Sequence, residues 1–184
     1  MSNLVILTGS LGSGKTTVTK LLAKELPDGV HIESDIFYSF FSHPIAPHLP
    51  AANHQNEAAI AASIQAALAF STRGYSVVLE EIFGPWFLPL ISSEMTSNQI
   101  DTRYIVLQTT LEEACERVRL RGDASNEHIV KAMHPQFADL GEFANHAVTT
   151  TGATPTEVAS RLHRLLYEVN YRINLAGGER GRVV

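Results

Sequence analysis

The sequence predicts an α/β fold in which helices flank a parallel sheet. Short apolar segments alternate with longer segments of helical periodicity, and such alternation is typical of parallel sheets with right-handed crossovers. The first apolar segment leads directly into a glycine-rich loop and a helix. With 184 residues, 45% hydrophobic and 18% charged, the chain has the size and composition of one globular domain, predicted over 1–184.

Five segments are predicted as strands. The first, NLVILT at 3–8, is an uninterrupted apolar run of the kind found in strands that are buried on both faces. The remaining strands are predicted at 30–34, 76–81, 103–109 and 146–151.

Helices are predicted between these strands, over 14–26, 55–74, 85–97, 110–122, 125–137 and 154–169. Thr110 with Glu113 three residues later forms a start signal, and Thr154 followed by Pro155 forms another. A proline-rich segment lies before the second helix, so we expect an excursion over about 36–72.

The composition limits the class of partner. A formal net charge of −5 argues against a general nucleic-acid or membrane-surface binder. Cys115 is the single cysteine, which favours a reducing compartment, and we expect it to be a core residue. No apolar segment approaches the ~20 residues that a membrane span needs, and we expect no signal peptide. The expected setting is the cytoplasm and the expected partner is a small molecule, with the oligomeric state left open.

Residues 9–16, GSLGSGKT, match the phosphate-loop pattern G-x-x-x-x-G-K-[ST] in full. The loop lies between a predicted strand and a predicted helix, which is the context that the motif requires. In such loops backbone N–H groups and the helix N-terminus bind an anion, the lysine reaches the outer phosphates, and the hydroxyl binds Mg²⁺. The predicted cofactors are therefore ATP and Mg²⁺, and the predicted loop contacts are Gly9, Ser10, Leu11, Gly12, Ser13, Gly14, Lys15, Thr16 and Thr17.

An acidic residue after the second predicted strand favours a kinase over a switch or a motor. The N-K-x-D segment of guanine-specific switches is absent, and the chain is short and acidic for a motor. Asp35 should lie at the carboxyl edge of the sheet, beside the phosphate loop. There it could accept a proton from an acceptor hydroxyl as that hydroxyl attacks the phosphate. It could also cap the following helical segment, and the two roles are compatible.

Glu80 and Glu81 end the third predicted strand, where phosphate-loop proteins place an acid that organises the magnesium shell. Adjacent strand residues point to opposite faces, so we expect one of the two to have this role. Val78 shares the face of Glu80, which slightly favours Glu80. The sequence leaves both Glu80 and Glu81 as candidate metal ligands beside Thr16.

Arg117 and Arg121 lie four residues apart, on one face of a predicted helix. One interpretation is that they form salt bridges with neighbouring glutamates on a solvated face. The other is a lid over about 117–135, whose guanidinium groups close on the triphosphate and stabilise charge during transfer.

These features resemble the small phosphate-loop kinases of the chloramphenicol phosphotransferase, gluconate kinase and shikimate kinase group, most of all the chloramphenicol phosphotransferases. The shared pattern is the phosphate loop, Asp35, the acidic pair in VVLEEIFG and an arginine segment ending in RLRGD. The resemblance implies an adenylate-kinase-like sheet with strand order 2-3-1-4-5. It also implies Asp35 as catalytic base, Arg117 and Arg121 as lid residues, and an adenine contact by the turn Thr151, Gly152 and Ala153.

The predicted acceptor region carries no lysine or arginine between Glu25 and Thr72. Kinases of nucleoside monophosphates, shikimate or gluconate bind an anionic acceptor, which needs a cation. A strongly anionic acceptor is therefore disfavoured unless the fold brings in Arg73 or Arg103. Aromatic side chains could instead hold a neutral ring, although several could equally belong to the core. The predicted acceptor contacts are Asp35, Phe37, Tyr38, Phe41, Glu80, Phe83 and Trp86.

The leading hypothesis is an ATP- and Mg²⁺-dependent phosphotransferase that acts on a hydroxyl of a small, largely neutral molecule. The resemblance makes an antibiotic or another natural product the expected acceptor, and hence antibiotic resistance the expected role. The first alternative is a metabolic sugar, polyol or nucleoside kinase. The alternative from a different class is a non-catalytic ATP-binding regulatory module.

Overall fold

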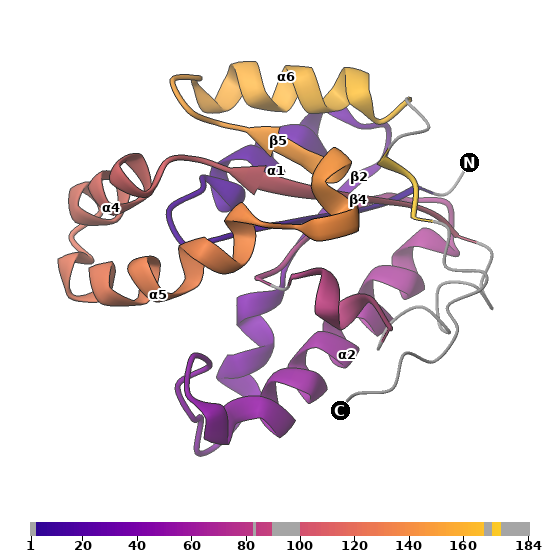
Figure 1. Cartoon of the computed structure of the whole chain (residues 1–184). Coiled ribbons are helices and arrows are strands. Elements are labelled where there is room, and N and C mark those ends of the chain that lie inside the picture. The colour runs from indigo at the N-terminus through magenta and orange to yellow at the C-terminus, as the bar shows by residue number, and fades with distance from the viewer. Residues whose placement is uncertain (1–2, 83, 90–99, 168–170, 174–184) are drawn as a thin grey trace.

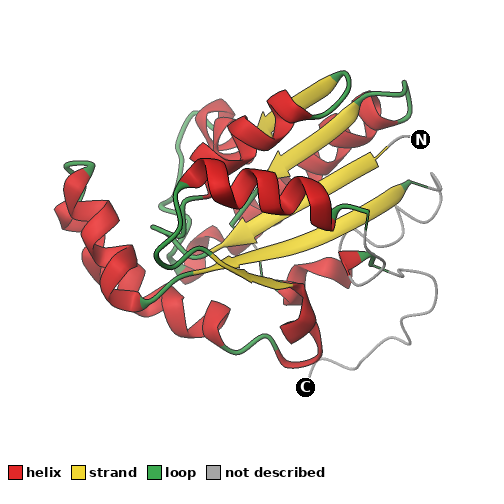
Figure 2. Ribbon diagram, turned by 90° about the horizontal axis from the view of Figure 1, so that it is seen from above, coloured by secondary structure: helices red, strands yellow, loops and turns green. Residues whose placement is uncertain are grey.

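The computed structural model describes residues 3–82, 84–89, 100–167 and 171–173, which form one parallel five-stranded sheet flanked by helices (Figures 1 and 2). The strand order is β2-β3-β1-β4-β5, as the resemblance implied, and the fold class predicted from the sequence is confirmed. The strands are β1 (Asn3–Gly9), β2 (Gly29–Glu33), β3 (Ser76–Glu80), β4 (Asp101–Gln108) and β5 (Ala147–Thr149).

The helices follow the predicted segments closely, and local sequence explains where two of them begin. Thr110 caps α4 by accepting a hydrogen bond from the backbone N–H of Glu113, and Thr154 and Glu157 form a full capping box at α6. The helices are α1 (Lys15–Glu25), α2 (Asn53–Ser71), α4 (Leu111–Leu120), α5 (Glu127–Ala138) and α6 (Pro155–Leu165). Short 3₁₀ helices are η1 (Ser34–Phe40), η2 (Pro50–Ala52), η3 (Pro85–Phe87), η4 (Ala124–Asn126) and η5 (Gly141–His146). Of the helix predicted over 85–97, η3 occupies the start, and residues 90–99 lie outside the described residues.

Alternating residues of the central strand divide the core into two layers. Val5 and Leu7 pack with α1 and α6 on one face, while Leu4 and Ile6 pack with α2 and α5 on the other. This arrangement is visible in Figure 1, where α6 and α2 lie on opposite sides of the strands. Because the sheet is covered on both faces, the carboxyl ends of its strands form the open edge where the phosphate loop lies.

Two parts of the chain extend beyond the sheet. The excursion predicted over 36–72 contains most of η1, with η2 and α2. The segment predicted as a lid over 117–135 contains the end of α4, η4 and most of α5, and α4 and α5 lie side by side in Figure 1. Cys115 is buried between these two helices, as a core residue should be. Among the described helices, none has both the length and the apolar character that a membrane crossing demands.

Candidate active site

The phosphate loop has a backbone that requires glycine at defined positions. Gly12 and Gly14 have φ angles of 82° and 94°, in the left-handed region, and Gly14 is the N-cap of α1. A Cβ atom on Gly12 would lie 2.5 Å from the backbone oxygen of Ala114 in α4, and one on Gly9 would lie 2.4 Å from that of Leu107. The glycines therefore allow the loop to pack closely against the end of β4 and against helix α4.

Lys15 is buried beneath this loop. Its Nζ donates hydrogen bonds to the backbone oxygens of Gly9 at 3.0 Å and Ser10 at 3.1 Å. Burial lowers the pKa of Lys15 to about 8, although the nearby carboxylates of Glu80 and Asp35 act in the opposite direction. A phosphate bound in the loop would favour the charged form of Lys15. The charged ammonium group would in turn stabilise the bound phosphate.

Glu80 lies against the helix that follows the loop. Thr16 Oγ1 donates to Glu80 Oε1 at 2.5 Å, Thr19 Oγ1 donates to Oε2 at 3.1 Å, and His31 Nε2 lies 3.2 Å from the same oxygen. Burial raises the pKa of Glu80, but the hydrogen bonds from His31 and Thr16 and the charge of Lys15 outweigh it, so the net shift is downward. His31 was not predicted from the sequence, because its contact depends on the pairing of β2 with β3.

The oxygens of Thr16 and Glu80 fit a magnesium ion. Mg²⁺ is commonly held by one or two protein oxygens, with phosphate oxygens and water completing its shell. No cluster of three acidic, histidine or cysteine side chains suited to a metal occurs within the part of the chain that the structure describes. Two adjacent oxygen ligands beside a phosphate loop therefore suit an ion that arrives with a nucleotide.

Glu80 and Glu81 both border a small pocket beside Asp35, but Glu81 also lines a larger cavity that Glu80 does not reach. Glu81 Oε1 accepts a hydrogen bond from the backbone N–H of Ile82 at 2.8 Å, and the side chain is buried. Burial raises the pKa of Glu81 to about 7, and it outweighs the hydrogen bonds from the Ile82 N–H and the Ser34 side chain, which act in the opposite direction. Of the two predicted metal ligands, the structure therefore brings Glu80 alone to Thr16. Glu81, rather than the predicted Glu80, lines the acceptor cavity described below.

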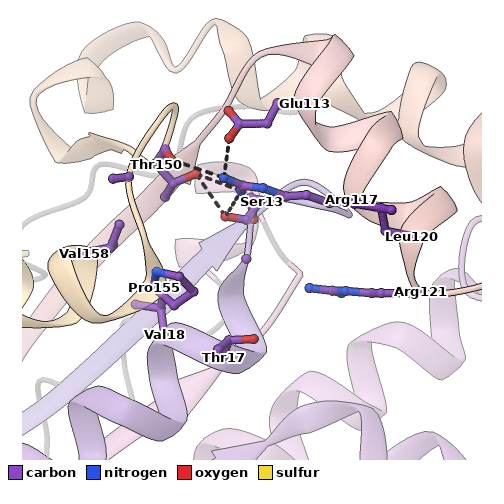
Figure 3. Close-up of a pocket in the computed structure, with 12 residues that line it drawn as sticks. Ser13, Thr17, Val18, Glu113, Arg117, Leu120, Arg121, Thr150, Pro155 and Val158 are labelled. Atoms are coloured by element: carbon purple, nitrogen blue, oxygen red, sulfur yellow. Dashed lines mark hydrogen bonds and ion pairs between the residues drawn. The ribbon is translucent and has the colours of Figure 1, made fainter.

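A cavity of about 450 Å³ opens on one side of the loop (Figure 3). Its walls come from the loop, α1, α4 and the turn between β5 and α6. Ala153 lines it, whereas Thr151 and Gly152 lie in the same turn without lining it. Thr150 and Pro155 also line the cavity, and neither was predicted as a contact. The size and position suit the nucleoside part of a nucleotide whose phosphates lie in the loop.

The two arginines that were predicted as lid residues are not equivalent in the structure. Arg117 donates to the backbone oxygens of Gly12 at 3.3 Å and Ser13 at 3.2 Å, to Thr150 Oγ1 and to the Thr150 backbone oxygen, both at 3.2 Å. It also pairs with Glu113 at 2.7 Å, so its guanidinium joins α4 to the loop and to the β5–α6 turn (Figure 3).

Arg121, which caps the C-terminus of α4, is exposed and borders the same cavity. Its charge lowers the pKa of Lys15, so the two cations lie near one another. No hydrogen bond or ion pair holds its guanidinium among the described residues, and it can therefore turn toward a phosphate.

A second cavity, of about 500 Å³, lies on the other side of the loop, between η1, α2, η3 and α5. Aromatic rings form much of its wall: Trp86 lies 5.9 Å from Phe137 between ring centroids, and His48 contacts His128 at 6.4 Å. No lysine or arginine lines it within the described chain. This cavity is the candidate acceptor site.

The predicted acceptor contacts are only partly brought together. Asp35, Tyr38 and Trp86 line the cavity. Phe37 packs against the hydrophobic core instead, Phe41 does not line the cavity, and Phe83 lies outside the described residues. Phenylalanine side chains are commonly buried in the core, and the sequence pattern alone does not distinguish a core residue from one that lines a pocket.

Neither arginine outside this region supplies a cation to the cavity. Arg73 follows α2 and donates to the backbone oxygen of Ala69, at the edge of the sheet where β3 begins. Arg103 is tied to Asp101 and to the Leu166 backbone oxygen near the start of β4. Both therefore lie at the edge of the sheet opposite the phosphate loop.

Asp35 lies between the phosphate loop and the acceptor cavity. It is in the first turn of η1, whose N-cap is Glu33, so the predicted capping role of Asp35 is wrong. Partial burial raises the pKa of Asp35 above its ordinary value, while the charge of Lys15 lowers it. The carboxylate remains accessible, lines the acceptor cavity and interacts with the lysine of the loop.

Comparison with known proteins places the chain among phosphate-loop proteins. The model of a family described as AAA domain matches residues 5–132, which include the loop, Asp35, Glu80 and both lid arginines. No curated protein sequence matches the chain significantly.

Solved structures with this fold include three small proteins. The tunicamycin resistance protein of Deinococcus radiodurans has a TM-score of 0.68 and 16% identity, covering 91% of this chain and 96% of that one. The APS kinase of Mycobacterium tuberculosis, in complex with AMPPNP and APS, has a TM-score of 0.65 and 19% identity, covering 90% and 97%. The shikimate kinase of Acinetobacter baumannii, in complex with shikimate, has a TM-score of 0.57 and 18% identity, covering 90% and 93%. The resemblance to small phosphate-loop kinases is thereby confirmed for the fold.

Proposed function

The chain belongs to the AAA domain family, and we propose that it is an ATP- and Mg²⁺-dependent phosphotransferase acting on a hydroxyl of a small, largely neutral molecule. The kinase-like fold supports nucleotide binding, and one neighbour was solved with AMPPNP. The observation that carries the proposal is the position of Asp35, between the phosphate loop and a cavity on the far side from the nucleotide cavity.

Each residue around the loop has a separate role in the proposed phosphoryl transfer. Lys15 and the loop backbone would hold the phosphates, with Arg121 turning inward to stabilise charge that develops on the transferred group. Thr16 and Glu80 would hold Mg²⁺, which when bound neutralises phosphate charge. Arg117 would line the nucleotide cavity and, through its hydrogen bonds to the backbone oxygens of Gly12 and Thr150, hold the β5–α6 turn against the loop.

The transfer itself needs one proton acceptor. The acceptor oxygen forms a bond to the γ-phosphorus as the bond to the bridging oxygen of ATP breaks, and ADP leaves. The hydroxyl proton passes to Asp35, whose raised pKa suits it to accept a proton during the reaction. The products are ADP and a phosphate monoester.

The walls of the acceptor cavity support a largely neutral acceptor. Aromatic and aliphatic side chains can hold a ring or an apolar body, and the described lining offers no cation for a carboxylate or phosphate. The similarity to a tunicamycin resistance protein supports a natural product or antibiotic as acceptor, and hence a resistance role.

The direct test is to incubate the protein with Mg·ATP and a panel of hydroxylated antibiotics, nucleosides, sugars and nucleoside monophosphates. We expect a neutral compound to gain one phosphoryl group, detected by mass spectrometry and located by ³¹P NMR. Asp35→Asn should abolish this transfer and leave nucleotide binding nearly intact. Transfer confined to nucleoside monophosphates, or full transfer by Asp35→Asn, would contradict the proposal.

A further inference from the structure

His31 is a partly buried histidine of the edge strand β2, and its ring contacts the candidate magnesium site. Its Nε2 lies 3.2 Å from Glu80 Oε2 and 3.1 Å from Thr19 Oγ1, and 16% of its side chain is exposed. Its neighbours along the strand, Val30 and Ile32, pack into the core on the other face of the sheet. His31 lines neither the nucleotide cavity nor the acceptor cavity, so any role that it has in the site must act through a neighbouring side chain.

The contacts of His31 require a hydrogen on Nε2. Burial raises the pKa of Glu80, but the hydrogen bond from His31 is the largest of the effects that make the net shift downward. The carboxylate is thus ionised and only accepts hydrogen bonds, so Nε2–H is the donor to Oε2. Thr19 does not replace this donor, because its single hydroxyl hydrogen also has the backbone oxygens of Lys15 and Thr16 within reach, at 2.9 and 3.2 Å.

Both oxygens of the Glu80 carboxylate are held, by groups from two different elements. Thr16 at the start of α1 donates to Oε1 at 2.5 Å, whereas His31 on β2 and Thr19 on α1 hold Oε2. With Oε2 fixed, Oε1 faces the Thr16 hydroxyl, the other oxygen that fits Mg²⁺. Hydrogen-bond partners behind a metal site orient its ligands, and their loss commonly weakens metal binding by about 10- to 100-fold. Without the hydrogen bond from His31, the carboxylate would be free to turn away from Thr16.

We propose that His31 is a positioning residue of the magnesium site, whose Nε2–H holds the Glu80 carboxylate so that Oε1 faces Thr16 before the ion arrives. In this role His31 touches neither the metal nor the nucleotide and acts through Glu80. This inference rests on the Mg²⁺ dependence in the proposed function and deepens it with a residue behind the metal ligands. It does not depend on the identity of the acceptor or on the transfer step.

Three variants of His31 separate the hydrogen bond from packing. His31→Phe keeps a ring but has no N–H donor. His31→Gln carries an amide N–H about as far from the backbone as Nε2, whereas the amide of His31→Asn reaches only as far as Nδ1. His163→Phe is the matched control, because His163 pairs with Glu25 at 3.6 Å, at the opposite end of α1 from the phosphate loop.

The measurement is the Kd of AMPPNP, by isothermal titration calorimetry, in EDTA and again at saturating Mg²⁺. The ratio of the two values reports how strongly the protein couples the metal to the nucleotide. His31→Phe and His31→Asn should lower this ratio by about tenfold and leave the Kd in EDTA essentially unchanged. His31→Gln should retain most of the ratio, and His163→Phe should behave as wild type. An unchanged ratio in His31→Phe, an equal loss of affinity with and without Mg²⁺, or a ratio as low in His31→Gln as in His31→Phe would overturn the inference.

A double variant shows whether His31 acts through Glu80. Glu80→Ala removes the carboxyl group, so adding His31→Phe to it should lower the ratio no further, because the two residues belong to one interaction. A further loss as large as that of His31→Phe alone would place the action of His31 elsewhere and overturn the inference. Thermal unfolding without nucleotide checks that each variant is folded. If His31→Phe does not fold, His31→Asn takes its place in every comparison.

Binding of AMPPNP involves no transfer, so this inference and the proposed function can fail separately. If no compound of the panel is phosphorylated while His31→Phe still loses its response to Mg²⁺, the proposed transfer fails and the role of His31 stands. If transfer occurs and His31→Phe responds to Mg²⁺ as wild type does, the inference fails and the proposed function stands. A wild type whose affinity for AMPPNP is the same in EDTA and in Mg²⁺ would also overturn the inference.

Discussion

Glu80 and Glu81 are consecutive residues whose carboxyl groups make different contacts. Glu80 accepts a hydrogen bond from Thr16 at the start of α1, whereas Glu81 lines the cavity that also contains Asp35. The alternation of side chains at the end of β3 places one acid toward the phosphate loop and the other toward the acceptor. The hydrogen bonds to Glu80 lower its pKa in spite of burial, and burial raises that of Glu81, so the two acids differ in chemistry as well as position.

The position of Glu80 predicts a specific magnesium defect. Glu80→Gln removes the charge beside Thr16, and we expect the Mg²⁺ concentration for half-maximal turnover to rise about 10- to 100-fold. Titration of Mg²⁺ at fixed ATP measures this. Glu81→Gln is the matched control and should leave the Mg²⁺ titration unchanged; an equal rise in both variants would contradict the separation of the two sites.

Arg117 in α4 and Arg121 at its C-cap should give different phenotypes. Arg121 has no bound partner in the described structure, so Arg121→Ala should lower kcat by roughly 10²-fold with little change in thermal stability. Arg117 donates to the loop and to the β5–α6 turn, so Arg117→Ala should cost about 2 kcal/mol of unfolding free energy and weaken nucleotide binding. Chemical denaturation and single-turnover kinetics distinguish the two. If Arg121→Ala destabilised the protein as much as Arg117→Ala, the assignment would be wrong.

Much of the fold follows from local sequence, and much of the site does not. The apolar run of β1, the phosphate loop and the caps at Thr110 and Thr154 are short-range signals, and the structure contains each where it was predicted. The contact of His31 with Glu80 depends on the pairing of β2 with β3.

The difference between Arg117 and Arg121 likewise depends on where the β5–α6 turn packs against α4. Both features are non-local, and no spacing along the chain specifies them.

Lys15 should matter for the triphosphate more than for the fold. Lys15→Ala removes a charged donor from the loop, and we expect the Kd for Mg·ATP to rise by about 10- to 100-fold. Lys20→Ala is the control on the same helix, since Lys20 forms an exposed pair with Glu33 and does not face the loop. Isothermal titration calorimetry measures both variants; wild-type affinity in Lys15→Ala would contradict the phosphate site.

Glu81 should make the stability of the protein depend on pH. Burial raises its pKa from 4.5 to about 7, so the folded state binds the proton more tightly than the unfolded state. The stability that this proton contributes is complete below the unfolded pKa of 4.5 and is lost as pH rises toward 7. Above that range the buried, charged carboxylate opposes folding, because the hydrogen bonds from Ile82 and Ser34 and the charge of Lys15 only partly compensate for its burial.

Glu81→Gln removes this titration. The unfolding free energy of the variant, relative to that of wild type, should therefore rise by ~2 kcal/mol between about pH 5 and pH 8. Urea denaturation at a series of pH values, without nucleotide or Mg²⁺, measures the difference. Glu57→Gln serves as the control, because Glu57 lies on α2, accepts a hydrogen bond from Asn53 and does not line the second cavity. Its stability curve should run parallel to that of wild type. Parallel curves for Glu81→Gln and wild type would mean that Glu81 is not held in a low-dielectric site. A rising difference would show that the folded protein buries a destabilising carboxylate in the wall of the second cavity.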